Sequence, residues 1–161
     1  MAELLIVYHS QTGGTRQMAE AAHEGARPEG PVRLLEARSA GPEDLLAAQG
    51  YLFAAPENLA AIAGVMKDFY DRCYYPVLGR LEGRPYAQMV CAGSDGTNAA
   101  RQTARIATGW RLREVQEPLI ICTHAQTPEA ILAPKVIAPD DLTHCRELGA
   151  ALGAGLAMGM F

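Results

Sequence analysis

Residues 4–15, LLIVYHSQTGGT, join an apolar run directly to a short loop rich in hydroxyl groups and glycine. The apolar run is short and rich in residues that favour strands, so it predicts a central strand buried on both faces. Beyond this stretch, small or apolar residues recur at helical spacing, at Met18, Ala21, Ala22 and Gly25. The loop therefore lies between the carboxyl end of a strand and the amino end of a helix, where free N–H groups and the helix dipole favour an anion.

The composition of this loop indicates which anion it binds. Its hydroxyl groups come from Ser10, Thr12 and Thr15, and it contains no lysine. A nucleoside triphosphate requires a Gly-Lys-Ser/Thr ending and a dinucleotide requires Gly-x-Gly-x-x-Gly, and neither motif is present. A neutral loop rich in donors suits a terminal phosphomonoester. In the alternative interpretation the loop is structural, and Ser10 or Thr12 caps the first amides of the helix.

Strands and helices alternate along the rest of the chain. Short apolar segments bounded by proline or glycine predict further strands near residues 32–36, 51–55, 87–92 and 118–122. Amphipathic patterns predict helices over residues 42–48, 62–73, 99–108 and 142–156. With 161 residues, 49% of them hydrophobic, the chain is expected to form a single domain over residues 1–161. Five strands alternating with helices predict an α/β fold, a three-layer sandwich with right-handed crossovers.

Two further loops follow strands whose carboxyl ends are expected to meet the first loop at one edge of the sheet. Residues 56–61 follow the third predicted strand, and residues 93–98 follow the fourth. Both loops contain many small or polar residues, which can present backbone groups to a flat polar ring. The sequence therefore predicts one crevice bordered by three loops.

Two motifs resemble those of flavodoxin-like proteins. Ser-x-Thr-Gly-x-Thr at residues 10–15 resembles the loop that binds the FMN phosphate in the flavodoxin family. The segment Ala55–Asn58, followed by Met66–Arg72, resembles the second flavin loop and helix of flavodoxin-like NAD(P)H-dependent FMN reductases and quinone reductases. The resemblance covers nearly the whole chain. It implies a five-stranded parallel sheet of order 2-1-3-4-5, with FMN where the strand order reverses.

The resemblance implies FMN as the cofactor and NAD(P)H as a co-substrate. It places the phosphate in the first loop, at Ser10, Gln11, Thr12, Gly13, Gly14 and Thr15. It places the isoalloxazine ring beside Pro56, Glu57, Asn58 and Leu59, and the pyrimidine edge of that ring beside Gly93, Ser94, Asp95 and Gly96. Because the cofactor carries the redox chemistry, no catalytic side chain is assigned and no metal is expected.

Two departures from electron-carrying flavodoxins bear on the function. Such carriers usually shield the ring with aromatic side chains, but this chain has none between Ala54 and Val65 or between Ala92 and Thr108. They also tend to be strongly acidic, whereas the net charge here is −4. An open ring favours a reductase that passes electrons from NAD(P)H through FMN to a quinone or another small acceptor. The alternatives are a flavodoxin-type electron carrier that serves protein partners, and a sensory or storage flavoprotein.

Several charged groups near the predicted crevice have two interpretations. A Glu57 carboxylate beside the ring makes the flavin harder to reduce, because reduction adds negative charge; alternatively, Glu57 points into solvent. His9 ends the first strand and is interpreted as a structural histidine. The basic residues of the fourth helix and its exit are interpreted as a solvated face, although an arginine near the crevice would meet the 2′-phosphate of NADPH. They are Arg101, Arg105, Arg111 and Arg113.

The remaining features concern location and partners. Cys73, Cys91, Cys122 and Cys145 all occupy apolar patterns and are predicted to be buried. No signal peptide and no apolar run of membrane length is recognised, so a cytoplasmic protein without membrane insertion is expected. We expect a small-molecule acceptor or a redox partner protein, and no nucleic acid. The apolar tail, residues 155–161, either covers the sheet or packs on a second copy in a homo-oligomer.

Overall fold

Seven strands form one sheet at the centre of the structure, a computed structural model that describes residues 1–161. They are β1 (Leu4–Tyr8), β2 (Val32–Glu36), β3 (Gly50–Asn58), β4 (Ala61–Ile62), β5 (Pro85–Ala92), β6 (Arg113–Glu114) and β7 (Leu119–Cys122). β2, β1, β3 and β5 are parallel neighbours in that order, and β6 and β7 both pair with the outer edge of β5. The five longer strands therefore have the order β2-β1-β3-β5-β7, which confirms the predicted order 2-1-3-4-5.

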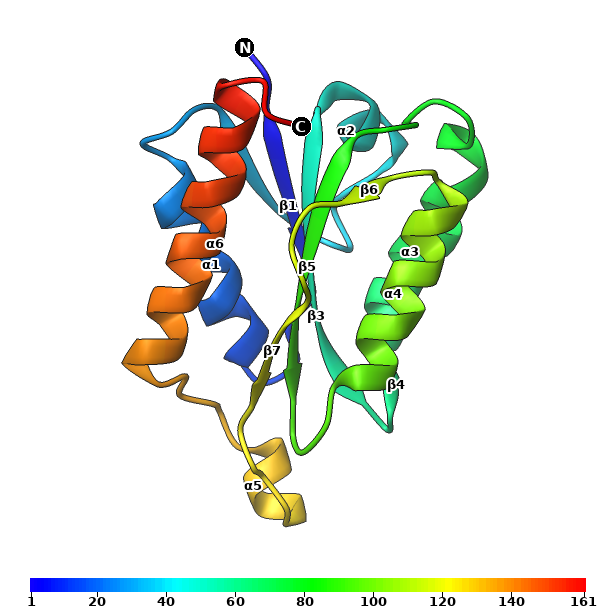
Figure 1. The fold of residues 1–161 in the computed structure, drawn as a ribbon. Coiled ribbons are helices and arrows are strands. Elements are labelled where there is room, and N and C mark those ends of the chain that lie inside the picture. Colours follow the sequence, from blue (N-terminus) through cyan, green and yellow to red (C-terminus); the bar gives the residue numbers. More distant parts are fainter.

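Helices cover both faces of this sheet, as Figure 1 shows. α1 (Gly14–Ala26) and α6 (Pro139–Ala157) lie on one face; α2 (Pro42–Ala47), α3 (Gly64–Val77) and α4 (Thr97–Gly109) lie on the other. Side chains that alternate along the strands build one core on each side. In β1, Leu5 and Val7 face α3 and α4, whereas Leu4 and Ile6 face α1 and α6. These two cores confirm the three-layer sandwich.

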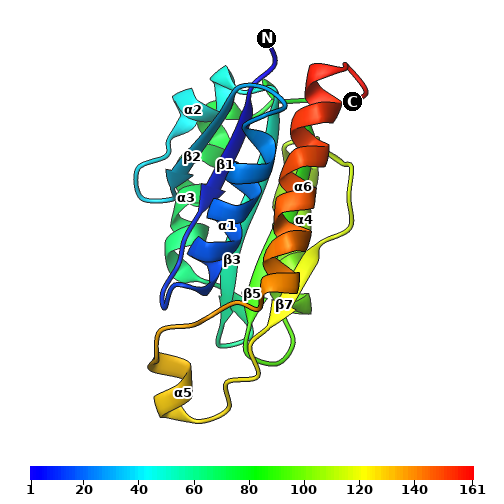
Figure 2. The same cartoon turned by 90° about the vertical axis from the view of Figure 1, so that its left-hand side faces the viewer.

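The carboxyl ends of the strands meet at the edge of the sheet opposite to the two chain termini. Figure 2 shows that the short helix α5 (Pro128–Leu132) projects beyond this edge. None of its five residues is buried, and no apolar pattern predicted it. The segment that contains α5 therefore stands next to the three predicted loops without belonging to either core.

The prediction of an irregular loop at residues 56–61 is wrong. This stretch is the end of β3, a tight turn and the start of β4. Leu59 and Ala60 form the turn with φ angles of 51° and 63°. Turns with two left-handed residues usually contain Asn-Gly, so Leu-Ala does not signal a hairpin. The helix predicted from residue 62 begins instead at Gly64, and Ile62 lies in β4.

The carboxyl-terminal tail turns back onto its own helix. The Met160 N–H donates to the Gly155 carbonyl at 2.9 Å, and the Phe161 ring lies against Gly155. The predicted cover over the sheet is therefore wrong, while packing of the tail on a second copy stays a prediction. No helix in the structure combines the length and the apolar character needed to cross a lipid bilayer.

Glycine residues allow α1 and α6 to pack with their backbones in close contact. A Cβ at Gly149 would overlap the Ala22 carbonyl, and a Cβ at Gly25 would overlap the Arg146 carbonyl. The position of α1, whose amino end borders the first loop, thus depends on two residues without side chains.

We predict that Gly149→Ala lowers the free energy of unfolding by about 1–3 kcal/mol, because the helices must separate to admit the methyl group. Urea unfolding measures this change. Gly64→Ala is the matched control, since nothing lies within 4 Å of a Cβ at the first residue of α3. Equal losses in the two variants would contradict the close helix contact.

Candidate functional site

Four segments border one pocket at the carboxyl edge of the sheet. The pocket has a volume of about 660 Å³. It is lined by Gln11 of the first loop, Glu57, Asn58, Leu59 and Ala60 of the β3–β4 hairpin, Gly93 and Ser94 after β5, and Ala125, Gln126 and Ile131 at α5. The structure therefore brings the three predicted loops together. The α5 residues belong to a fourth wall that the sequence did not predict.

The first loop leaves the amino end of α1 free to accept an anion. Gly13 adopts a φ of 94° before the helix begins, and no side chain caps the helix. The backbone N–H groups of Gly14, Thr15 and Arg16 have no protein acceptor. The Ser10 Oγ accepts the Gly13 N–H at 3.1 Å, so it holds the turn instead of capping the first helical amides. The alternative interpretation of the loop as a helix cap is therefore wrong for Ser10.

Thr15, the second residue of α1, carries a buried hydroxyl group. The residue is 1% exposed, and its Oγ1 lies beside the Cys91 thiol and makes no hydrogen bond to nitrogen or oxygen. A buried hydroxyl without a partner costs free energy, which a phosphate oxygen at this position would recover. Gly14 is fixed by its neighbour in β5, because a Cβ there would lie 2.7 Å from the Cys91 sulfur. These observations fit a phosphate group bound by the loop.

A lysine from a distant part of the chain also reaches this loop. The Lys135 Nζ donates to the Thr12 Oγ1 at 3.3 Å, and the Lys135 N–H donates to the Thr12 carbonyl at 2.8 Å. Sequence reasoning missed Lys135 because 123 positions separate the two residues. The first loop carries no charged side chain of its own, but the Lys135 ammonium places a positive charge beside it.

Glu57 joins the β3–β4 hairpin to the amino end of α4. Its Oε1 accepts the Gly96 N–H at 2.9 Å, and its Oε2 accepts the Ala99 N–H at 3.0 Å. Glu57 is half-buried, so the predicted solvent orientation is wrong. The carboxylate supplies the acceptors for a helix that has no cap of its own, and it also lines the pocket.

Two amide side chains hold the hairpin against its neighbours. The Asn58 Nδ2 donates to the Gln11 Oε1 at 3.0 Å, which joins the hairpin to the first loop. The Asn98 Nδ2 donates to the Ala60 carbonyl at 2.5 Å, which joins it to α4. Leu59, at the tip, is fully exposed at the rim of the pocket. The hairpin is thus fixed at Asn58 and at its turn, where it presents the apolar Leu59 side chain.

Of the first-loop residues predicted to hold the phosphate, only Gln11 lines the pocket, and three of the residues predicted beside the ring do not line it. Pro56 is buried in β3, and Gly96 is the buried residue that precedes α4 with a φ of 89°. The Asp95 Oδ1 accepts the Thr97 hydroxyl at 2.7 Å and the Thr97 N–H at 3.2 Å, and these bonds lower the pKa of Asp95. These residues shape the third loop, while Gly93 and Ser94 reach the pocket.

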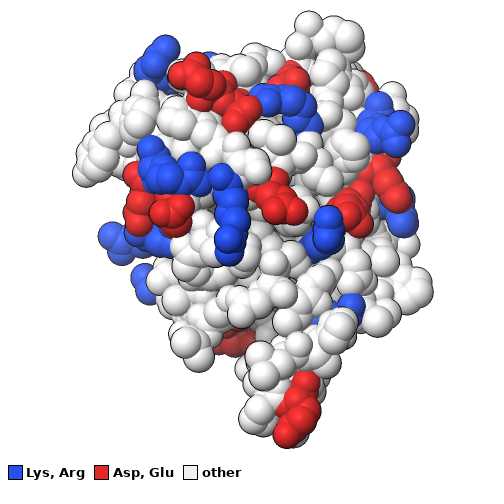
Figure 3. All heavy atoms as spheres, turned by 180° about the vertical axis from the view of Figure 1, so that it is seen from behind, with Lys and Arg blue, Asp and Glu red and all other residues white.

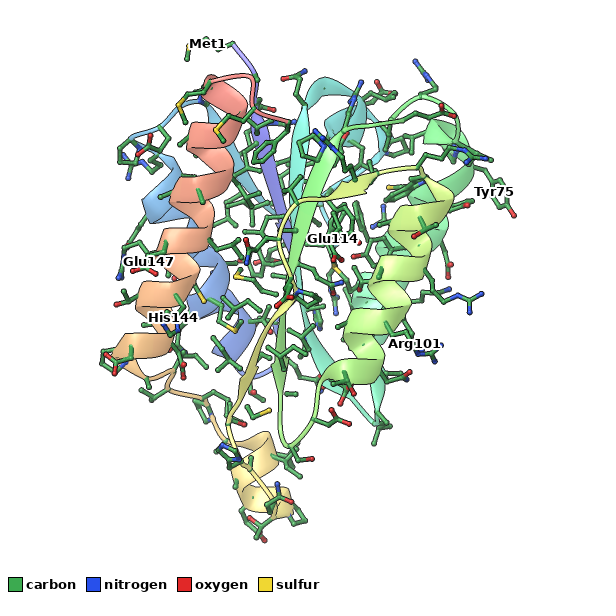
Figure 4. All side chains as sticks on the ribbon, in the orientation of Figure 1. Met1, Tyr75, Arg101, Glu114, His144 and Glu147 are labelled. Atoms are coloured by element: carbon green, nitrogen blue, oxygen red, sulfur yellow. The ribbon has the colours of Figure 1, made fainter.

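Several other candidates lie outside the pocket. His9 borders a separate recess of about 350 Å³ that contains Arg16 and Arg38, and burial together with the Arg38 charge lowers the pKa of His9. Figure 4 shows Arg101 pointing outward from α4, where its Nη2 donates to the Asn98 Oδ1. Arg111 and Arg113 follow the carboxyl end of α4, at the far end of that helix from the pocket. The basic residues of α4 and its exit line no part of the pocket.

The cysteines are buried as predicted, with one exception. Cys73, Cys91 and Cys145 are buried, and burial raises the pKa of the Cys91 thiol to about 11. Cys122 is half-buried at the end of β7, where its Sγ donates to the Asp95 carbonyl at 3.6 Å. Burial raises the pKa of Cys73 and Cys145 as well, so these three buried thiols are not reactive thiolates at neutral pH.

We predict that Glu57→Gln destabilises the start of α4, because an amide has one acceptor oxygen and turns an N–H donor toward the second helix amide. The free energy of unfolding should fall by about 1–3 kcal/mol. Hydrogen exchange at Gly96 and Ala99 should become faster. Glu147→Gln is the control, because Figure 4 shows Glu147 on the outer side of α6. Unchanged exchange at both amides in Glu57→Gln would show that the carboxylate does not cap α4.

Comparison with known proteins places the chain among flavin-dependent proteins. Residues 39–127 match a family described as NADPH-dependent FMN reductase. A flavodoxin of Aquifex aeolicus is 40% identical over 96 residues, which cover 58% of this chain and 50% of that protein. An NAD(P)H dehydrogenase (quinone) of Acidithiobacillus ferrooxidans is 31% identical over 94 residues, which cover 45% of this chain and 47% of that protein. The chain spans about half the length of these two relatives.

Solved structures show the same fold at lower identity. A flavodoxin from the Archaea superposes with a TM-score of 0.77 at 17% identity, covering 96% of this chain and 98% of that one. A flavodoxin, WrbA-like protein from Agrobacterium tumefaciens has a TM-score of 0.71 at 22% identity, with 99% of both chains covered. The flavodoxin-like fold predicted from the sequence is confirmed. By the family match over more than half of its residues, the chain belongs to the NADPH-dependent FMN reductase family.

Proposed function

We propose that residues 1–161 form a single FMN-binding domain that passes electrons from NAD(P)H through FMN to a quinone or another small acceptor. The cofactor agrees with the family, which is defined by FMN reduction. The observation that carries the proposal is the first turn of α1, where three backbone N–H groups have no acceptor and the buried Thr15 hydroxyl bonds to no nitrogen or oxygen. This phosphate-binding geometry lies beside a pocket large enough for a flat ring.

The first loop would hold the phosphate. Gly14, Thr15 and Arg16 would each donate a backbone N–H, and Thr15 would add its hydroxyl. A single terminal phosphate satisfies these donors. Since the chain has no second motif for a diphosphate, the loop favours FMN over FAD.

The pocket would hold the isoalloxazine ring. Its walls combine the apolar side chains of Leu59 and Ile131 with the amides of Gln11, Asn58 and Gln126. These groups can contact the faces of a flat ring and bond to its polar edge. No aromatic residue lines the pocket, so nothing in the walls stacks over both faces of the ring. An accessible face is what a nicotinamide needs for hydride transfer.

When bound, FMN supplies the ability to accept a hydride and to release electrons to the acceptor. The chain contributes position and environment. The first loop fixes the phosphate end, the Glu57 bridge keeps the hairpin and the start of α4 at a set distance, and the α5 segment limits access of water from one side. No nucleophilic side chain is required for this reaction.

The intermixed charge on one face of the molecule supports a small acceptor. Figure 3 shows blue and red side chains intermixed over the body of the face seen from behind, with mostly uncharged atoms around the projecting lower end. A carrier that docks on protein partners benefits from one continuous acidic face. The second candidate function, a flavodoxin-type carrier, is favoured by the 40% identity to the Aquifex aeolicus flavodoxin.

We predict that Thr15→Val weakens FMN binding without lowering the free energy of unfolding. The variant loses one hydrogen bond to a charged phosphate, so FMN affinity should fall by about 1.5–3 kcal/mol, while riboflavin affinity changes far less. Stability without flavin should change little, because the hydroxyl bonds to no nitrogen or oxygen there and lies only beside the neutral Cys91 thiol. Fluorescence titration and urea unfolding measure the two effects. Thr108→Val, on the outer side of α4, is the control. Equal losses of affinity for FMN and riboflavin would show that the phosphate does not bind at Thr15.

We predict that NADH or NADPH bleaches the bound flavin within seconds under anaerobic conditions, without a partner protein, and that a quinone restores the colour. Absorbance spectroscopy follows both steps. Leu59→Trp should slow reduction by the nucleotide, because an indole at the rim covers the open face, whereas Leu78→Trp at the end of α3 should not. If dithionite reduces the flavin and neither nucleotide does, the reductase function is wrong; a stable semiquinone and turnover that needs a reductase partner would then identify the carrier.

A further inference from the structure

Lys135 lies where the segment after α5 crosses the first loop. Besides its contacts with Thr12, its Nζ donates to the carbonyls of Ile131 and Ala133, each at 2.7 Å. The Gln17 side chain, on α1, forms two hydrogen bonds to the backbone of the same segment. Its Nε2 donates to the Lys135 carbonyl at 2.7 Å, and its Oε1 accepts the Ile137 N–H at 3.0 Å. The backbone that carries Lys135 is therefore fastened to the start of α1.

The Lys135 ammonium is positive and has no carboxylate partner. None of the ion pairs in the structure includes it, whereas Lys67, the only other lysine, pairs with Asp71 at 2.7 Å. Lys135 is half-buried, and its three acceptors are two backbone carbonyls and one hydroxyl, all uncharged. A partly desolvated cation without an anion gains more from a phosphate than an exposed one does.

We propose that Lys135 is a direct ligand of the flavin phosphate and adds to the preference for FMN over riboflavin that the first loop provides. The inference rests on the proposed function, because it assumes that the first loop holds this phosphate. The ammonium already contacts the Thr12 hydroxyl of that loop. A dianionic phosphate at the start of α1 thus meets free amides on one side and a positive charge on the other.

The same side chain connects the phosphate to the wall of the ring pocket. Lys135 bonds to the carbonyl of Ile131, and the Ile131 side chain lines the pocket. Binding of the phosphate therefore holds the α5 segment in place beside the ring. Riboflavin, which has no phosphate, fills the ring pocket without this connection. The alternative role, in which Lys135 only caps the carbonyls at the end of α5, predicts no difference between the two flavins.

Equilibrium binding to Lys135→Met separates the two roles. FMN affinity should fall roughly 10-fold to 100-fold, since a charge-assisted hydrogen bond is lost, and riboflavin affinity should not change. Salt should weaken FMN binding to the wild type more than to the variant. Lys135→Arg should restore most of the affinity, and Lys67→Met, the same charge change on α3, should have no effect. Equal losses for FMN and riboflavin in Lys135→Met overturn the proposal in favour of the helix-capping role.

A second measurement observes Lys135 in the wild-type protein. Reductive methylation with ¹³C-formaldehyde labels the two lysines and the α-amino group of Met1; Lys67→Arg and Lys135→Arg assign the two lysine signals. FMN and inorganic phosphate should each shift the Lys135 signal, riboflavin should not, and the Lys67 signal should stay fixed. If the protein binds FMN and the Lys135 signal does not shift, the role of Lys135 is overturned, while the proposed function still stands. A wild-type protein that binds no FMN overturns the proposed function as well.

Discussion

The parallel alignment of β1, β3 and β5 is the constraint on which the site depends. Because these strands run in one direction, the chain leaves each of them at the same edge of the sheet. All five residues of β1 and all eight of β5 are buried, so helices must cover both faces and the connections must cross over them. The first loop, the β3–β4 hairpin and the loop after β5 are therefore neighbours in space. The pocket is the gap that these connections leave at the point where strand order reverses.

In the proposed site, backbone groups would carry much of the binding chemistry. The free amides of α1 exist because Gly13 turns the chain without capping the helix. Gly14 has no side chain because Cys91 lies beneath it. Glu57, in β3, accepts N–H groups at the start of α4, so the amino ends of the two helices that border the site differ. One helix end is satisfied by the protein itself, and the other is available to a ligand.

The five longer strands and the major helices followed from short-range patterns, since a buried parallel strand or an amphipathic helix is visible in a few consecutive residues. The strand order came instead from the resemblance to flavodoxin-like proteins, and the two-residue strands β4 and β6 were not predicted. The β3–β4 hairpin was missed because Leu59 and Ala60 occupy positions where Asn-Gly is usual. α5 was missed because none of its residues is buried, so no apolar periodicity marks it. The contacts of Lys135 with Thr12 and of Glu57 with Gly96 join residues far apart in sequence, and only the fold brings them together.

A ¹H–¹⁵N NMR titration of the uniformly labelled protein with FMN and with riboflavin tests the central claim most directly. The account predicts that both flavins shift the amides of the residues that line the pocket. FMN alone should move the amides of Gly14, Thr15 and Arg16 strongly downfield, because they donate to the phosphate. If FMN binds and the chemical shifts of these three amides are the same as with riboflavin, the phosphate lies elsewhere and the account of this site is wrong.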